Sequence, residues 1–204
     1  MDASTVRQAF DEAAQLFLDT VAEVTPEGLD APGLGVWTVR DLIGHTARSF
    51  VTIETYVPQG ADAVDVPSAA HYYAAVEATA NDAASVAQRG RDAGQALGPD
   101  PVRGVQELAE RVLALVHETP DDALTATAGG GMRFIDYLGT RVLELGVHTL
   151  DLARVVADEV VLPPAVAAVV LHLLADLANT PERSGPVILA LTGRAPLPAG
   201  FSLV

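Results

Sequence analysis

Glu144 and His148 stand four residues apart in a proline-free stretch that is rich in leucine and valine. On a helix, residues at this spacing lie on one face, one turn above the other. A carboxylate oxygen and an imidazole nitrogen could therefore reach one metal ion from that face. His45, far earlier in the chain, could supply a third ligand from a second helix. Two histidines and a glutamate would leave a coordination position open for water or substrate, as in catalytic zinc sites.

The spacing alone leaves a second interpretation open, because a glutamate and a histidine four apart also form solvent-exposed pairs on many helices. Five polar residues fall on one stripe of the expected helix, beside an apolar arc: Tyr137, Arg141, Glu144, His148 and Asp151. Such a stripe favours a lined cavity, although a solvated helix face would look similar. His45 borders the apolar arc of its own helix, which suits a metal ligand and a half-buried structural histidine equally.

The remaining histidines, His71, His117 and His172, are expected to be structural. Trp37 precedes a helix cap, where an aromatic side chain usually packs against the helix. Gly129 to Gly131 do not follow a recognisable strand, so they do not predict a phosphate-binding loop, and no G-x-S-x-G nucleophile motif is present.

Helices must position the candidate ligands. Apolar residues three and four apart predict a helix from Ser4 to Val24 and another from a Thr38 cap to about Val57, with Asp41 completing an imperfect capping box. Further helices are expected over residues 68–97, 101–118, 132–156 and 163–179. Residues 119–131 are expected to form a loop, and the partly β-branched run 187–192 a strand.

These elements predict an all-α dominated protein with two parts. Residues 1–158 would form an antiparallel four-helix bundle, a fold that commonly builds metal sites from facing helices. Residues 159–204 would form a small α/β appendage of one helix and one strand.

Composition excludes several classes of function. The chain has 204 residues, of which 50% are hydrophobic, and a formal net charge of −15. Such an acidic chain repels phosphate backbones, so we expect no nucleic-acid partner. The sequence has no cysteine, which excludes disulfides, cysteine-ligated zinc and a thiol nucleophile borne by the protein.

The first residues lack the features of a signal peptide, and no segment is long and apolar enough to span a bilayer. We therefore expect a cytoplasmic protein that acts on a small molecule, as a monomer or homodimer.

Two motifs together resemble a known family. The block from Trp37 to His45, Trp-Thr-Val-Arg-Asp-Leu-Ile-Gly-His, is followed downstream by Arg-x-x-Glu-x-x-x-His-x-x-Asp-Leu, which begins at Arg141. This combination is similar to the mycothiol-dependent maleylpyruvate isomerases, which belong to the DinB-like metal-binding four-helix bundles. The resemblance covers about residues 5–156. The segment from Leu189 to Gly200 is similar to part of the C-terminal domain that often accompanies the bundle, here shortened.

The resemblance implies that His45, Glu144 and His148 bind a divalent metal, most simply zinc, and that the thiol mycothiol is the co-substrate. A metal in an open site lowers the pKa of a thiol. The resulting thiolate would add to a cis double bond conjugated to a carbonyl, and its expulsion after bond rotation would give the trans isomer. In a transferase the thiolate would attack an electrophile instead. Arg48 and Arg141 are the candidates for pairing with carboxylates, and Arg194 is a candidate for binding the thiol. A metal hydrolase and a non-catalytic metal-binding protein remain alternatives.

Overall fold

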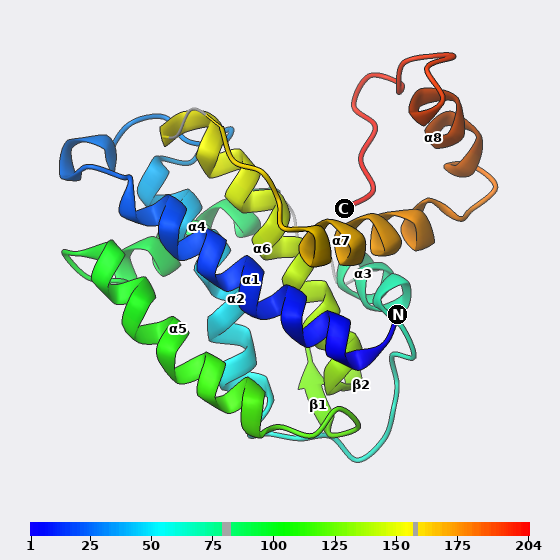
Figure 1. Ribbon diagram of the computed structural model, residues 1–204, viewed down its shortest axis with the longest axis horizontal. Helices are drawn as coiled ribbons and strands as arrows, with labels where there is room; N and C mark the ends of the chain where they lie inside the picture. The colour runs from blue at the N-terminus through cyan, green and yellow to red at the C-terminus, as the bar shows by residue number, and fades with distance from the viewer. Residues whose placement is uncertain (79–82, 157–158) are drawn as a thin grey trace.

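Four long helices enclose the core of the protein (Figure 1). They are α1 (Ala3–Ala22), α2 (Val39–Tyr56), α5 (Pro101–Glu118) and α6 (Phe134–Val156). α1 and α2 each pack against both α5 and α6. The computed structural model describes residues 1–78, 83–156 and 159–204. The predicted four-helix bundle is confirmed.

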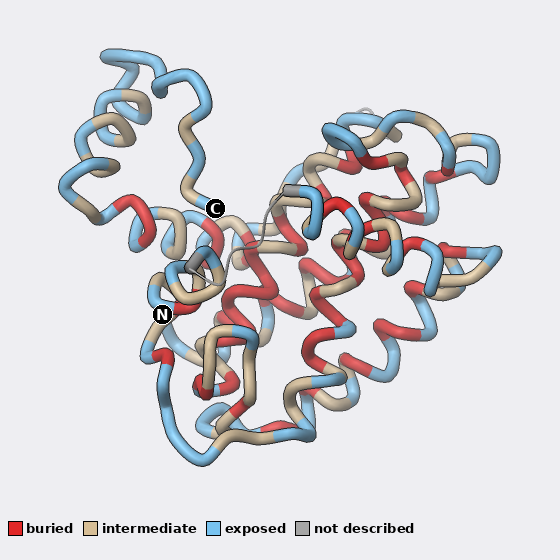
Figure 2. The backbone as a smooth tube through the Cα atoms, turned by 180° about the vertical axis from the view of Figure 1, so that it is seen from behind, coloured by how far each residue is buried: buried red, intermediate tan, exposed pale blue. Residues whose placement is uncertain are grey.

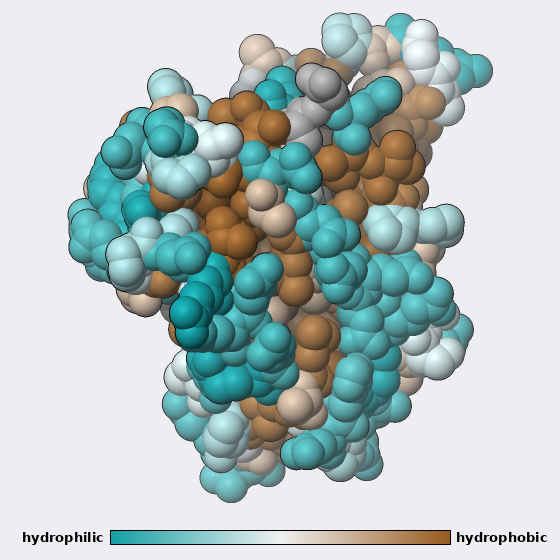
Figure 3. Space-filling model, turned by 60° about the vertical axis from the view of Figure 1, so that its left-hand side comes forward, coloured by the Kyte–Doolittle hydropathy of each residue, from teal (hydrophilic) through white to brown (hydrophobic). Residues whose placement is uncertain are grey.

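Aromatic side chains fill the centre of the bundle. Phe10 and Phe17 of α1 are fully buried and both contact Phe50 of α2, with ring centroids 6.1 and 6.2 Å apart. Burying such side chains is the main favourable contribution to packing the helices together. Buried residues accordingly follow the inner faces of the long helices (Figure 2), while hydrophilic residues cover much of the outer face shown in Figure 3.

The start of α2 confirms the predicted capping box. The Thr38 hydroxyl accepts a hydrogen bond from the Asp41 backbone N–H at 3.2 Å, and the Asp41 carboxylate accepts one from the Thr38 N–H at 3.0 Å. Both bonds satisfy backbone donors that the first helical turn leaves free. The start of α2 is therefore defined locally, about two turns before His45.

Shorter elements surround the bundle. They are the 3-10 helix η1 (Pro26–Gly28), α3 (Ala69–Ala78), α4 (Ala83–Ala96), α7 (Pro164–Ala178), α8 (Ser184–Leu191) and the strands β1 (Leu124–Thr127) and β2 (Gly130–Arg133). α4 packs on α2, and α7 packs on α1 and α6. α3 and α4 fall within the helix expected over residues 68–97, whose residues 79–82 lie outside the described part of the chain. Within that part, no helix combines the length and apolarity needed to cross a membrane.

The loop expected over residues 119–131 is wrong, because β1 and β2 pair there as an antiparallel hairpin. Contacts from a distant loop stabilise this short hairpin. The carbonyl of Gly131 accepts hydrogen bonds from the N–H groups of Asp65 and Val66, and the Gly131 N–H donates to the Asp65 carboxylate at 2.9 Å. A Cβ atom at Gly131 would lie 2.0 Å from the Ala63 carbonyl oxygen. The glycines that indicated a loop therefore permit a close approach between two segments.

The strand expected over residues 187–192 is also wrong, because this run lies in α8 and the turn that follows it. A strand needs a neighbour to satisfy its backbone groups. Among the described residues, the sheet consists of β1 and β2 alone, so this run has no strand to pair with. Helical hydrogen bonds satisfy its backbone locally instead. α8 buries none of its residues and projects away from the bundle (Figure 1).

Candidate metal centre

The structure brings His45, Glu144 and His148 together, although the first comes from α2 and the other two from α6. One ligand atom from each side chain can be chosen so that all three lie within 4.8 Å of one another. The rings of His45 and His148 meet edge to face, with centroids 4.8 Å apart. Glu144 Oε2 lies 3.4 Å from His148 Nε2. This is a group that could hold one divalent metal ion.

Burial rules out the interpretation of Glu144 and His148 as a solvated surface pair. Their side chains are only 23% and 17% exposed. Together with His45 they line a cavity of about 540 Å³. The cavity is large enough for a small organic molecule.

Hydrogen bonds orient the two α6 ligands toward the same point. Glu144 Oε1 accepts a hydrogen bond from the Tyr73 hydroxyl at 2.9 Å, which leaves Oε2 facing His148. His148 Nδ1 lies 3.1 Å from Asp151 Oδ2, so once the ring is neutral, as metal binding requires, Nδ1 would keep its proton and Nε2 would offer its lone pair. Carboxylate partners of this kind fix the tautomer and the orientation of metal-binding histidines.

His45 is held by packing rather than by hydrogen bonds. Its ring lies against Trp37, with centroids 4.3 Å apart, and the Trp37 indole N–H donates to the Ala87 carbonyl at 3.0 Å. His45 Nδ1 is buried and has no hydrogen-bond partner among the described residues. A buried polar atom without a partner is costly. A ring whose nitrogens are not occupied by protein partners suits a metal ligand, so the donor set fits a divalent ion.

The three ligand groups differ in charge in the metal-free protein. Burial, with the nearby charge of His148, lowers the pKa of His45 to about 4. Burial also opposes the charging of His148, but its hydrogen bonds to Asp151 and Glu144 outweigh that effect and raise its pKa to about 9. Burial would likewise keep Glu144 neutral, yet His148 and the charge of Arg141 hold the pKa of this carboxyl well below its usual range. At neutral pH the site therefore holds a neutral His45, a cationic His148 and an anionic Glu144.

We expect zinc binding to release about one proton at pH 7, because His148 must lose a proton to become a ligand. The pKa of His148 lies above pH 7, so zinc competes with that proton, and affinity rises about tenfold per pH unit as the pH approaches 9. His45 contributes no proton above pH 4. Calorimetric titration in buffers of different ionisation enthalpy measures the release. A binding heat that is identical in all buffers would contradict the expectation.

The predicted arginines occupy three different environments. Arg48 is half-buried and lines the cavity. Arg141 also lies at the cavity, but only 6% of it is exposed, and its guanidinium sits 4.9 Å from the ring centre of Tyr137 and 5.5 Å from that of Tyr72. Arg194 is exposed in the segment after α8, where it donates to the Thr192 carbonyl, and it does not line the cavity.

The other histidines make polar contacts away from the candidate metal group. His71 contacts the Ser68 hydroxyl at 2.8 Å, and His172 lies 3.8 Å from the Asp176 carboxylate one turn away. His117 lies 3.1 Å from Asp11 across the α1–α5 contact. None of the three belongs to the metal-binding group found among the described residues.

Among the residues that line the cavity, Tyr72, Tyr73 and Arg89 are not predicted by the sequence. They fall within residues 68–97, for which the sequence predicts one long helix, and none stands at a spacing that relates it to a ligand. Only the packing of α3 and α4 beside the bundle brings them to the site. The aromatic pair Tyr72-Tyr73 was the one local signal available, since adjacent aromatics are unusual in an alanine-rich helix.

Comparison with known proteins identifies a family. Residues 10–153 match the family described as Mycothiol maleylpyruvate isomerase N-terminal domain. The match reaches from α1 to the last turns of α6 and includes all three candidate ligands. No curated protein and no solved structure matches the chain.

Proposed function

The chain belongs to the mycothiol maleylpyruvate isomerase N-terminal domain family, and from that premise we propose that it is a metal-dependent enzyme that uses a small thiol. The proposed reaction is the cis–trans isomerisation of a maleylpyruvate-like substrate, or the transfer of the thiol to an electrophile. The observation that carries the proposal is the convergence of His45, Glu144 and His148 at one wall of a cavity.

We propose zinc as the metal, because two imidazoles and one carboxylate are the ligand set of several catalytic zinc sites. A bound zinc ion acts as a Lewis acid and lowers the pKa of a thiol or water at its open position. The protein's own contribution is to hold His148 through Asp151 and Glu144 through Tyr73, so that little reorganisation accompanies binding.

The absence of cysteine supports a thiol that comes from outside the chain. Mycothiol, named in the family description, is the proposed co-substrate. Arg48 faces the cavity from α2 and is proposed to contact an acidic group of the substrate. Arg141 is proposed to act on catalysis through its charge beside Glu144, because its own guanidinium is enclosed by tyrosines. The contact of Arg194 with the thiol stays a prediction, as does the division of the chain after residue 158.

The test is turnover by zinc-loaded protein with and without mycothiol. We expect conversion of maleylpyruvate to its trans isomer, followed by absorbance, only when the thiol is present. Glu144→Gln should lower the rate by more than about a hundredfold, because the charge that balances the metal is lost. His172→Ala is the matched control, since His172 also pairs with an acid four residues away but is exposed on α7, and its rate should equal that of the wild type.

The alternatives predict different results in the same assay. Zinc-dependent formation of hydrolysis products in the absence of thiol would identify a metal hydrolase. Stoichiometric zinc without turnover of maleylpyruvate or of a thiol-reactive electrophile would favour a non-catalytic metal-binding protein. Equal rates for wild type and Glu144→Gln would contradict the proposed site.

A further inference from the structure

Two arginines from different helices meet at the cavity beside the candidate metal ligands. Arg48 lies on α2, one turn after His45, and Arg89 lies on α4. Both are half-buried, and both line the cavity that contains His45, Glu144 and His148. They also line a neighbouring cavity of about 540 Å³ between α2, α4 and α5.

The close packing of α2 on α4 fixes this meeting. Arg40 donates to the Gly98 carbonyl at 2.9 Å, and a Cβ atom on Gly44 would lie 2.1 Å from the Gly94 nitrogen. The residue number therefore rises along α2 while that of its contact falls along the chain at α4, so the two helices run antiparallel. One turn further along α2, the same register brings Arg48 opposite Arg89.

Neither arginine has a partner of opposite charge within residues 1–78, 83–156 and 159–204. Arg48 and Arg89 form no hydrogen bond or ion pair with any residue that the structure describes. The acids of the neighbouring cavity are engaged elsewhere. Glu54 binds Arg111, Glu107 binds Arg103, and Asp92 accepts a hydrogen bond from Gln88.

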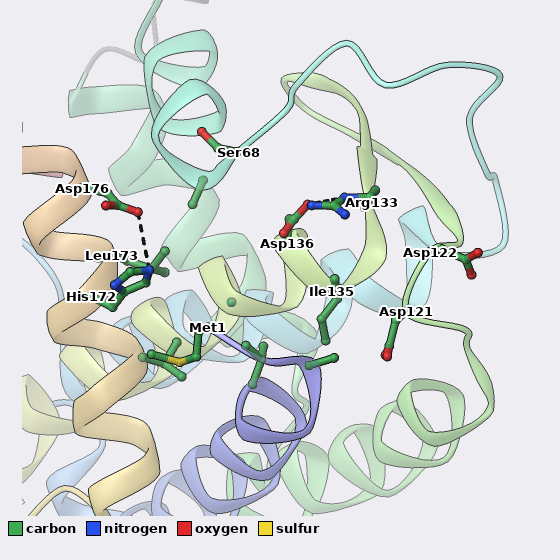
Figure 4. Close-up of a pocket in the computed structure, with 15 residues that line it drawn as sticks. Met1, Ser68, Asp121, Asp122, Arg133, Ile135, Asp136, His172, Leu173 and Asp176 are labelled. Atoms are coloured by element: carbon green, nitrogen blue, oxygen red, sulfur yellow. Dashed lines mark hydrogen bonds and ion pairs between the residues drawn. The ribbon is translucent and has the colours of Figure 1, made fainter.

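This arrangement contrasts with a cavity of about 410 Å³ at the other side of α6 (Figure 4). There, Arg133 pairs with Asp136 at 2.6 Å, and His172 pairs with Asp176. The chain carries an excess of acidic residues, with a net charge of −15. Two adjacent guanidiniums that lack a carboxylate are therefore not explained by a shortage of acids.

Leaving the two guanidiniums together has an energetic cost. Burial and the charge of Arg89 both lower the pKa of Arg48, which means that its charged form is disfavoured there. A bound anion would remove that cost, because a guanidinium donates two parallel hydrogen bonds to a carboxylate. Charge repulsion retained at a cavity wall is typical of a binding site rather than of a stabilising contact.

We propose that Arg48 and Arg89 form an oxyanion-binding site that holds a carboxylate of the substrate beside the His45–Glu144–His148 group. Arg89 is thereby a specificity-determining residue for acidic substrates. The assignment of the anion to the substrate rests on the proposed function, whereas the existence of the anion site does not. The shared chemistry of carboxylate and phosphate leaves two sources for the anion, and we assign the carboxylate because the proposed maleylpyruvate-like substrate carries carboxylates.

The test measures anion binding to the metal-free full chain by calorimetry, without thiol. The probes are maleate and inorganic phosphate. We expect maleate to bind more tightly than phosphate, and Arg48→Gln and Arg89→Gln each to weaken maleate binding by at least about tenfold, because each removes a charged hydrogen-bond donor. Arg91→Gln is the control: it makes the same charge change on α4 at a half-buried residue that lines neither cavity. Its maleate affinity should equal that of the wild type.

The melting temperature separates binding from a structural role. Removing one of two repelling charges should leave the Tm of Arg48→Gln and Arg89→Gln equal to or above that of the wild type. A lowered Tm in both variants would identify structural arginines and overturn the proposal. So would unchanged maleate affinity in both variants, or equal weakening in Arg91→Gln. Tighter binding of phosphate than of maleate would overturn the carboxylate assignment. Because no metal, thiol or turnover enters the measurement, failure of the proposed enzyme activity leaves its result unaffected.

Discussion

Replacing His148 with alanine is expected to lower the zinc affinity of the protein by more than about a hundredfold, since even the partners that orient metal ligands contribute tenfold to a hundredfold. The substitution removes one of the three proposed metal ligands and also the partner of Asp151 and Glu144. Metal analysis of the purified protein after dialysis against zinc should find about one zinc per chain in the wild type and far less in the variant.

His172→Ala provides the comparison for this experiment. Both histidines pair with an acid four residues away on a helix, but the His172 side chain is 50% exposed and that of His148 only 17%. If the removal of any histidine lowered the zinc content, His148→Ala and His172→Ala would both lose zinc. Equal metal contents in wild type and His148→Ala would refute the site. His45→Ala should behave like His148→Ala, because it also removes one of the three proposed ligands, whose Nδ1 has no hydrogen-bond partner among the described residues.

Replacing Gly44 with alanine is expected to destabilise the protein by about 1–3 kcal/mol or more, the usual cost of overpacking. The added methyl group would lie 2.1 Å from the Gly94 nitrogen and 2.4 Å from its Cα atom. These are backbone atoms, so no side-chain rotation can relieve the clash. α4 must move away from α2 instead. Denaturant unfolding measures the free-energy difference.

The displacement of α4 should also reach the site. Gly90 of α4 lies so close to Trp37 that a Cβ atom there would be 2.7 Å from the indole nitrogen, and Trp37 in turn packs on His45. Gly44→Ala should therefore weaken zinc and maleate binding as well as stability. Gly185→Ala is the control, because a Cβ atom at Gly185 meets no atom within 4 Å. Its stability should be unchanged or slightly raised, since alanine favours helix over glycine. Equal destabilisation by the two substitutions would contradict the packing argument.

The bundle was predictable because its determinants are local. Each of the helices α1, α2, α5 and α6 shows its apolar spacing within a few turns of sequence, and the capping box joins Thr38 to Asp41 only three residues later. The hairpin and α8 were not predictable on the same basis. β1 and β2 depend on hydrogen bonds from Asp65 and Val66, far away in the chain. The run 187–192 has the composition of a strand but no neighbouring strand among the described residues.

The site divides in the same way. The sequence alone predicts that Glu144 and His148 share a helix face, since the helical repeat places residues four apart on one side. It also shows that the chain carries no thiol of its own, because there is no cysteine. The packing of the helices brings His45 to this pair, encloses Arg141 between Tyr72 and Tyr137, and places Arg89 at the same cavity as Arg48.

The physical reason is that a helical repeat relates residues within one element and says nothing about which face of another element will meet it. That meeting depends on packing. The backbone contact at Gly44 and Gly94 sets how closely α4 approaches α2, and thereby which α4 side chain reaches the cavity. Gly44 and Gly94 carry no reactive side chain, but their close contact determines the position of Arg89 beside the candidate metal ligands.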